Sequence, residues 1–255
     1  MATQSHRSDP RVLNQRSLER DHPFLAAFLK PGMRVLDAGC GTGAITSGIA
    51  RLVGPSGRVV GVDRDASLLA AAREQWASSE VEFVEGDLVA GLPFDGEFDV
   101  VNAARTLQWV TDPRAAVAAM VRAAKPGGVV IALDYDHAFN SWNPKPGDGF
   151  RIFYVDFLDW RFSNGWSNTM GTQLGRLFAE AGLSHVESHD ANEVSRDRER
   201  LALWLHVIES IGPRMEAAGY GFDSERVAAE YHDWMSADGA EQTLSLRVAL
   251  GVKLP

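Results

Sequence analysis

A glycine-rich segment at residues 35–43, Val-Leu-Asp-Ala-Gly-Cys-Gly-Thr-Gly, has the spacing that says most about chemistry. An apolar run leads into the glycines, and a helical pattern follows them. Glycine lets the backbone approach a ligand closely because it has no Cβ atom, and the first turn of a helix offers free N–H groups. The segment therefore predicts either a ligand-binding turn or a tight turn that only caps a helix.

Two kinds of ligand are compatible with this turn. Gly39, Gly41 and Ala44 match the glycine positions of a dinucleotide-binding fingerprint, and Asp63 follows about twenty residues later. Asp37, however, lies at the tip of the preceding strand, where a carboxylate would repel a pyrophosphate. The same carboxylate suits a ligand with a positive amine and no phosphate, such as S-adenosylmethionine. We therefore favour S-adenosylmethionine over a nicotinamide dinucleotide.

Alternating apolar and helical segments predict the elements that position these residues. Strands are expected at 34–37, 59–63, 81–84, 98–101 and 129–133, with helices between them at 43–53, 65–76 and from 112 to about 125. Two later strands, at 184–190 and 243–252, complete a set of seven. The pattern predicts an α/β fold with a seven-stranded, mostly parallel, doubly wound sheet. Ligands of such sheets bind beyond the carboxyl ends of the strands.

The remaining segments are expected to surround this sheet within one domain, 1–255. Residues 1–30 should hold N-terminal helices, and the insertions 137–171 and 197–238 should form helical lids, with 137–149 as a loop. Residues 135–166 contain ten of the twenty-three Phe, Tyr and Trp residues. Helical spacing of these rings favours a hydrophobic core, and a few of them are expected to line the ligand crevice and exclude water.

The glycine turn resembles the first motif of the class I S-adenosylmethionine-dependent methyltransferases, which have a Rossmann-like fold. The resemblance extends over roughly residues 30–136 and implies that Asp63, next to Arg64, holds the ribose hydroxyls, and that Asp87 and Leu88 meet the adenine. Phe-Asp-Val-Val-Asn at 98–102 resembles the fourth-strand motif of this family. The implied cofactor residues are Asp37, Gly39, Cys40, Gly41, Thr42, Gly43, Asp63, Arg64, Asp87, Leu88, Asn102 and Ala103.

Candidate acceptor-binding residues follow the fourth and fifth strands. Leu-Gln-Trp-Val at 107–110 is similar to a stretch in trans-aconitate methyltransferases and in methyltransferases that esterify malonyl-carrier protein. Arg105 could bind an acceptor carboxylate in a bidentate manner, or pair with Asp134 or Asp136 in a purely structural role. His137 is either a general base or a histidine of a surface loop.

Bulk composition narrows the partners. The formal net charge of −9 argues against a long nucleic-acid-binding surface, and Cys40, the sole cysteine, cannot form an intramolecular disulfide. We expect a cytoplasmic monomer or homodimer that does not bind membranes, because the start is polar and no apolar stretch approaches ~20 residues. No metal is expected, since His185 and His189, four apart on a strand, would lie ~13 Å apart.

The favoured function is therefore methylation of a small molecule, at oxygen or nitrogen, possibly a carboxylate, with S-adenosylmethionine as the donor. Methyl transfer needs alignment of nucleophile, carbon and sulfur rather than a catalytic triad. Two alternatives stay open: a nicotinamide-dependent oxidoreductase, and a protein that binds S-adenosylmethionine without methylating anything.

Overall fold

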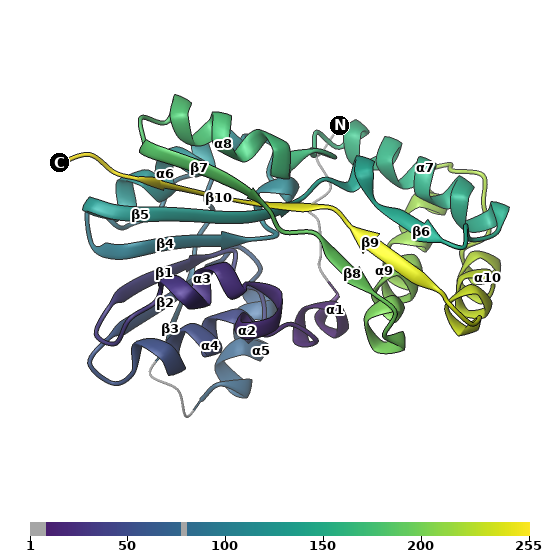
Figure 1. The fold of residues 1–255 in the computed structure, drawn as a ribbon, viewed down its shortest axis with the longest axis horizontal. Coiled ribbons are helices and arrows are strands. Elements are labelled where there is room, and N and C mark those ends of the chain that lie inside the picture. Colours follow the sequence, from purple (N-terminus) through teal and green to yellow (C-terminus); the bar gives the residue numbers. More distant parts are fainter. Residues whose placement is uncertain (1–8, 78–80) are drawn as a thin grey trace.

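The computed structural model describes residues 9–77 and 81–255. Its centre is a seven-stranded sheet with the order β3-β2-β1-β4-β5-β10-β7 (Figure 1). The strands are β1 (Arg34–Ala38), β2 (Arg58–Asp63), β3 (Val81–Glu85), β4 (Phe98–Ala104), β5 (Ala124–Tyr135), β7 (Ser184–Asp190) and β10 (Leu246–Val252). Strands β1 to β5 pair in parallel, whereas β10 runs antiparallel to β5 and β7. The predicted seven-stranded, mostly parallel sheet is confirmed.

Helices cover both faces of this sheet because successive strand residues point to opposite sides. Val35 of β1 packs in one hydrophobic cluster with α4, while the next residue, Leu36, packs in another with α6 and α8. The covering helices are α4 (Ala44–Val53), α5 (Ala66–Gln75), α6 (Pro113–Ala123) and α8 (Met170–Glu180). Asp65 and Asp112 cap α5 and α6 as their sequence positions predict, each accepting backbone N–H bonds.

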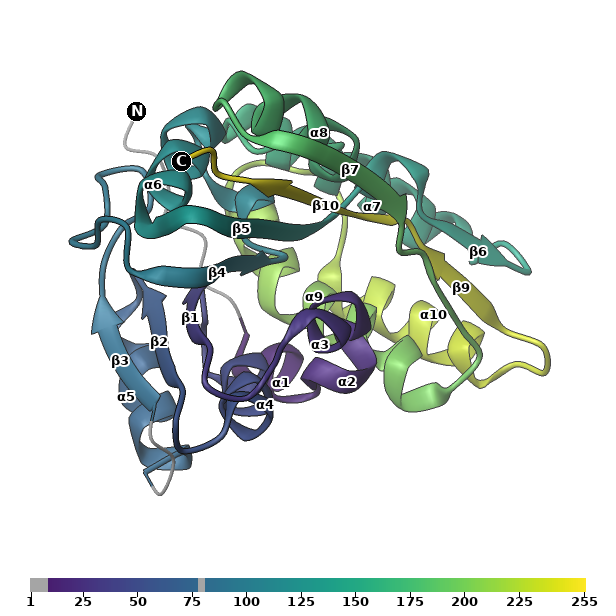
Figure 2. The ribbon, with the colours of Figure 1, turned by 60° about the vertical axis from the view of Figure 1, so that its left-hand side comes forward.

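The helices expected near the N-terminus are three short ones, α1 (Pro10–Asn14), α2 (Leu18–Asp21) and α3 (Pro23–Phe28). Each begins at its own cap, because the side chains of Asp9, Ser17 and His22 accept backbone N–H bonds there. Leu18 and Leu25 are fully buried against the sheet side that also carries α9 (Arg198–Ala217). Figure 2 shows α1, α2, α3 and α9 gathered on that side.

A second, three-stranded sheet extends the fold and was not predicted. It has the order β6-β9-β8, formed by β6 (Ser141–Asn143), β9 (Glu241–Leu244) and β8 (Glu193–Ser195). The predictions of a plain loop at 137–149 and of one strand at 243–252 were therefore wrong in part. Both errors have one cause: β6 is a three-residue strand paired with a segment about one hundred residues away, so no local pattern marks it.

The lid helices pack around a cluster of aromatic rings. They are α7 (Asp148–Ser163), α9 and α10 (Ser224–Ser236), and the short helices η1 (Leu107–Trp109) and η2 (His137–Phe139) lie at the ends of β4 and β5. The five periodic rings of α7 are all buried, namely Phe150, Phe153, Tyr154, Phe157 and Trp160. These rings therefore form mainly a core. Among the described residues, no helix is long and apolar enough to cross a membrane.

Candidate functional site

A large cavity, here called the main cavity, opens at the carboxyl ends of the parallel strands. It encloses about 1290 Å³, part of which is open to solvent. Its lining includes a residue at or just after the end of each of the first five strands of the sheet: Gly39, Asp63, Gly86, Ala104 and Tyr135. The edge of the sheet predicted to bind a ligand is thus hollow, as expected for a ligand site of such a fold.

The glycine turn forms one wall of the main cavity. Gly39, Gly41 and Gly43 all have positive φ angles, of 78°, 55° and 76°, a region that side chains disfavour. A Cβ atom on Gly39 would lie 2.3 Å from the Thr106 side chain. The turn therefore requires glycine at this position, both for its backbone conformation and for the contact with Thr106.

Asp37 lies behind the turn rather than on the cavity wall. One carboxylate oxygen accepts a hydrogen bond from Thr46 Oγ1 at 2.7 Å, and the other accepts one from Asn102 Nδ2 at 2.8 Å. Asn102 Oδ1 in turn lies 3.0 Å from His22 Nε2. Burial raises the pKa of Asp37 and lowers the pKa of His22 to about 3. Asp37 thus organises a buried chain of polar side chains, and its contact with a ligand amine stays a prediction.

Asp63 and Asp87 lie on the cavity wall at the ends of neighbouring strands. The two carboxylate oxygens of Asp63 accept the N–H groups of Gly41 at 2.8 Å and Asp65 at 2.9 Å. Burial raises the pKa of Asp63. Asp87 accepts the N–H of Val89 at 2.8 Å. Both carboxylates are half-buried, and each keeps lone pairs for a further donor such as a ribose hydroxyl or an adenine amino group.

A small hollow adjoins the glycine turn and tests whether an amino-acid-bearing nucleoside fits here. Asp37, Gly39, Cys40, Gly41 and Thr42 are among the residues that line it. Thr42 Oγ1 is buried and has no hydrogen-bond partner among the residues that the structure describes. An unpaired buried hydroxyl beside a glycine turn is costly unless a ligand or water satisfies it. These features fit the methionyl end of S-adenosylmethionine.

The other half of the main cavity is lined by aromatic and aliphatic side chains. The rings are those of Trp109, Tyr135, His137, Phe157 and Trp204, and α9 adds Leu203, Val207 and Ile211. The His137 ring stacks on Tyr135, with centroids 4.9 Å apart. Such a lining excludes water and favours an apolar or aromatic ligand.

His137 is buried in this wall, so its interpretation as a surface-loop histidine is wrong. Its Nε2 atom lies 2.6 Å from Gln108 Oε1. That oxygen also accepts a bond from Arg161, and Gln108 Nε2 donates to the Arg105 carbonyl, so His137 must carry its proton on Nε2. Burial, together with the positive charge of Arg161, holds the pKa of His137 well below its usual value. His137 is therefore neutral at neutral pH, and its role as a general base stays a prediction.

Arg161 supports this wall from behind. It is fully buried, and its guanidinium lies 4.0 Å from the centre of the Trp109 ring. Burial lowers the pKa of Arg161 to about 9 and raises that of Asp134 to about 7. Asp134 accepts a hydrogen bond from the backbone N–H of Gln108, and Arg161 donates one to the backbone carbonyl of Gln108. The pair thus fixes the backbone of Gln108, whose side chain bonds His137.

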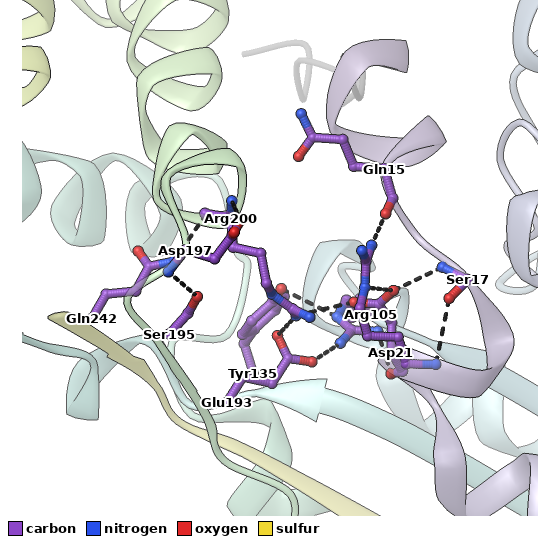
Figure 3. A network of polar contacts seen from close by, with 11 residues as sticks. Gln15, Ser17, Asp21, Arg105, Tyr135, Glu193, Ser195, Asp197, Arg200 and Gln242 are labelled. Atoms are coloured by element: carbon purple, nitrogen blue, oxygen red, sulfur yellow. Dashed lines mark hydrogen bonds and ion pairs between the residues drawn. The ribbon is translucent and has the colours of Figure 1, made fainter. Parts of the chain in front are cut away.

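Arg105 is part of a buried polar network (Figure 3). Its Nε donates to the Tyr135 hydroxyl at 3.1 Å, and its two terminal nitrogens bond the Asp21 carbonyl and the Glu193 carboxylate. Its φ angle of 56° is rare for a side-chain-bearing residue. The predicted structural partners Asp134 and Asp136 were wrong. The partner is Glu193 of β8, since Asp134 bonds backbone N–H groups and Asp136 bonds Thr172.

Comparisons with known proteins agree with this geometry. A family model described as a methyltransferase domain matches residues 29–182. A ubiquinone/menaquinone biosynthesis C-methyltransferase of Stutzerimonas stutzeri is 39% identical over 207 residues, which cover 79% of this chain and 68% of that protein. The chain belongs to the class I S-adenosylmethionine-dependent methyltransferases.

Two further matches show the extent of the similarity to this methyltransferase. The C-methyltransferase of the same name from Pseudomonas savastanoi pv. phaseolicola is 36% identical over 135 residues, 51% of this chain and 52% of that protein, so the chain spans about half the length of such relatives. The structure of Haemonchus contortus phosphoethanolamine N-methyltransferase 2 in complex with S-adenosyl-L-methionine has a TM-score of 0.57 and 19% identity, covering 93% of this chain and 51% of that one. The latter similarity concerns the fold.

The structure separates the predicted site residues of the methyltransferase into three groups. The main cavity is lined by Gly39, Gly41, Asp63, Arg64, Asp87, Leu88, Arg105 and His137. The small hollow adds Asp37, Cys40 and Thr42. Gly43, Asn102 and Ala103 do not line either space in the described part of the chain. Gly43 is the residue just before α4 and lies close to Phe83 and Trp76, while Ala103 is buried within the sheet.

Sequence reasoning missed the contribution of the N-terminal segment to the cavity. Val12 and Leu13 of α1, and Arg16 after it, line the main cavity together with residues of α9. Arg11 ties α1 to α9 through an ion pair with Glu209 at 2.8 Å. In the sequence, only the apolar residues of α1 and the arginines around them could have indicated this contribution to the cavity. No local sequence pattern places these residues near the sheet.

Proposed function

We propose that this protein transfers the methyl group of S-adenosylmethionine to a small molecule held beneath α9. The observation that supports this best is the shape of the main cavity. It runs from the strand-end carboxylates Asp63 and Asp87 to the aromatic wall of Tyr135 and Trp204, so a nucleoside and an acceptor can lie end to end.

The cofactor half of the cavity supports a definite set of roles. Asp63 is proposed to accept bonds from the ribose hydroxyls, with Asp87 and Leu88 at the adenine edge, and the glycine turn leaves room for the methionyl part. When bound, S-adenosylmethionine supplies an electrophilic methyl group. The residues of this chain would then bind and orient both reactants and exclude water, which is most of what an in-line displacement requires.

The acceptor half supports a small molecule rather than a polymer. α1 and α9, which contact each other, both line it, and aromatic rings contribute to the rest of its wall. The sequence suggests oxygen or nitrogen as the acceptor atom, and the C-methyltransferases among the relatives add carbon as a third candidate. His137 is proposed to form part of the wall, because its low pKa makes it a weak base.

A binding and turnover experiment tests this function. Calorimetry should show low-micromolar binding of S-adenosylmethionine and S-adenosylhomocysteine, and no binding of NAD or NADP. Incubation with small-molecule extract and labelled S-adenosylmethionine should yield S-adenosylhomocysteine and a labelled small product. Tight NAD binding without adenosyl-ligand binding would favour an oxidoreductase. Binding without turnover in any extract would favour a non-methylating protein, and robust labelling of bulk RNA, DNA or protein would contradict a small-molecule acceptor.

A further inference from the structure

A second cavity, here called the side pocket, adjoins the acceptor half of the main cavity. The two spaces share six lining residues, Val12, Arg16, Arg105, Tyr135, Leu203 and Leu244. The side pocket is small, and besides apolar residues its lining includes Gln15, Ser195 and Gln242 together with several charged side chains. A ligand in the aromatic half of the main cavity could therefore extend a polar group into it.

Positive charge exceeds negative charge in the side pocket. Four arginines line it, Arg16, Arg20, Arg105 and Arg200, against two acids, Asp21 and Glu193. Glu193 forms ion pairs with Arg105 and Arg200 (Figure 3). Asp21 forms ion pairs with Arg20 and Arg200, and both of these N···O distances are 3.1 Å. The two carboxylates are thus neutralised by Arg20, Arg105 and Arg200, and neither is paired with Arg16.

Arg16 is the arginine of the side pocket that does not take part in these ion pairs. Among the residues that the structure describes, its guanidinium has no hydrogen-bond or ion-pair partner. Burial lowers the pKa of Arg16, and the nearby charge of Arg105 lowers it further, against the opposite effect of Tyr135, Asp21 and Glu193. Arg16 itself lines the side pocket. A half-buried cation next to a second cation favours an anionic partner.

We propose that the side pocket binds an anionic group of the acceptor, a carboxylate or a phosphate, and that Arg16 contacts it directly. This inference rests on the proposed methyl transfer, which puts the acceptor in the adjoining aromatic half. A guanidinium presents parallel N–H donors that match either anion. Arg105 instead holds the network together, because its own donors already bond Tyr135, Asp21 and Glu193.

The competing occupant is the carboxylate of S-adenosylmethionine, since Arg16 also borders the small hollow at the glycine turn. Saturating the protein with S-adenosylhomocysteine separates the two, because the cofactor carboxylate is then already in place. The probes are benzoate and phenyl phosphate, which combine a ring with an anion, and benzamide, a neutral compound of similar shape to benzoate. Each is titrated into the saturated protein by calorimetry.

We expect at least one of the two anions to bind, and benzamide to bind at least about tenfold more weakly, because it lacks the charge. The tighter-binding compound of the two shows whether the side pocket favours a carboxylate or a phosphate. Arg16→Met should weaken the preferred anion at least about tenfold and leave the affinity for S-adenosylhomocysteine within about twofold. Arg51→Met is the matched control: Arg51 is an exposed arginine of α4, paired with Glu19 outside the cavity, and its loss should change neither affinity.

Three results would overturn the proposal: no binding of either anion, equal binding of the preferred anion and benzamide, or an Arg16→Met variant that loses S-adenosylhomocysteine but keeps the anion. The last result would assign Arg16 to the cofactor carboxylate. Failure of the wild-type protein to bind S-adenosylhomocysteine would count against the proposed function instead. The same anion titrations on the ligand-free protein would then still test the side pocket by itself.

Discussion

Replacement of Asp63 by alanine tests the cofactor half of the site most directly. Its two oxygens already accept the N–H groups of Gly41 and Asp65, and their remaining lone pairs are proposed to accept the ribose hydroxyls. Loss of hydrogen bonds to a charged acceptor costs about 1.5–3 kcal/mol, equivalent to a rise in Kd of about 10- to 150-fold. We therefore expect Asp63→Ala to weaken S-adenosylhomocysteine binding by that factor.

The same substitution should also destabilise the fold, because it removes the acceptor of two backbone N–H groups. Each group left unsatisfied costs about 1–3 kcal/mol, and water that enters the cavity should hold the total near the lower end. For a chain of this size each kcal/mol lowers the Tm by about 2–4 °C. Thermal unfolding of the ligand-free variant measures this contribution separately from binding.

Calorimetry with S-adenosylhomocysteine and its 2′-deoxyribose analogue completes a double-mutant cycle on the ribose contact. The wild-type protein should prefer the natural ligand, and Asp63→Ala should lose that preference. Glu85→Ala is the matched control, since Glu85 is paired in register with Asp63, is exposed and does not line the described main cavity. Unchanged affinity in Asp63→Ala, an intact preference for the ribose hydroxyl, or an equal loss in Glu85→Ala would refute the assignment.

Three further predictions concern the fold and the remaining site residues. Asp87→Asn keeps an acceptor oxygen and should weaken S-adenosylhomocysteine binding less than Asp87→Ala; wild-type affinity in both variants would remove Asp87 from the adenine edge. Arg105→Lys keeps a charge but cannot bond all three partners at once, so denaturant unfolding should show a loss of about 1–3 kcal/mol with unchanged S-adenosylhomocysteine affinity. A higher acceptor KM at unchanged stability would restore Arg105 as a direct ligand. His22 has a folded-state pKa of about 3, so its contribution to stability is present above its unfolded pKa of 6.5 and declines as pH falls toward 3, by up to about 1.4 kcal/mol per pH unit. His22→Gln should flatten the fall in unfolding free energy between pH 6 and 4.5, and an unchanged slope would contradict this.

The sequence by itself determined the central sheet and the residues at its strand ends that line the cofactor half of the main cavity. Apolar strands, glycine stops and acid caps are local signals, and each one acts over a few residues. Once the strands are parallel, their carboxyl ends must share one edge, which is why Gly39, Asp63 and Asp87 could be placed at one cavity without coordinates. The positive φ of Gly39 is equally local, although the contact with Thr106 that forbids a side chain there is not.

Tertiary structure alone decided what the polar residues around that edge do. Arg105 and Glu193 are 88 positions apart, and Asn102 and His22 are 80 apart, so no spacing could pair them. The bonds that join Asp37 to Thr46 and Asn102 likewise depend on the packing of distant segments and could not be inferred from spacing. The position of α1 at the cavity also depends on contacts with α9, because a five-residue helix holds too few local interactions to fix its own place.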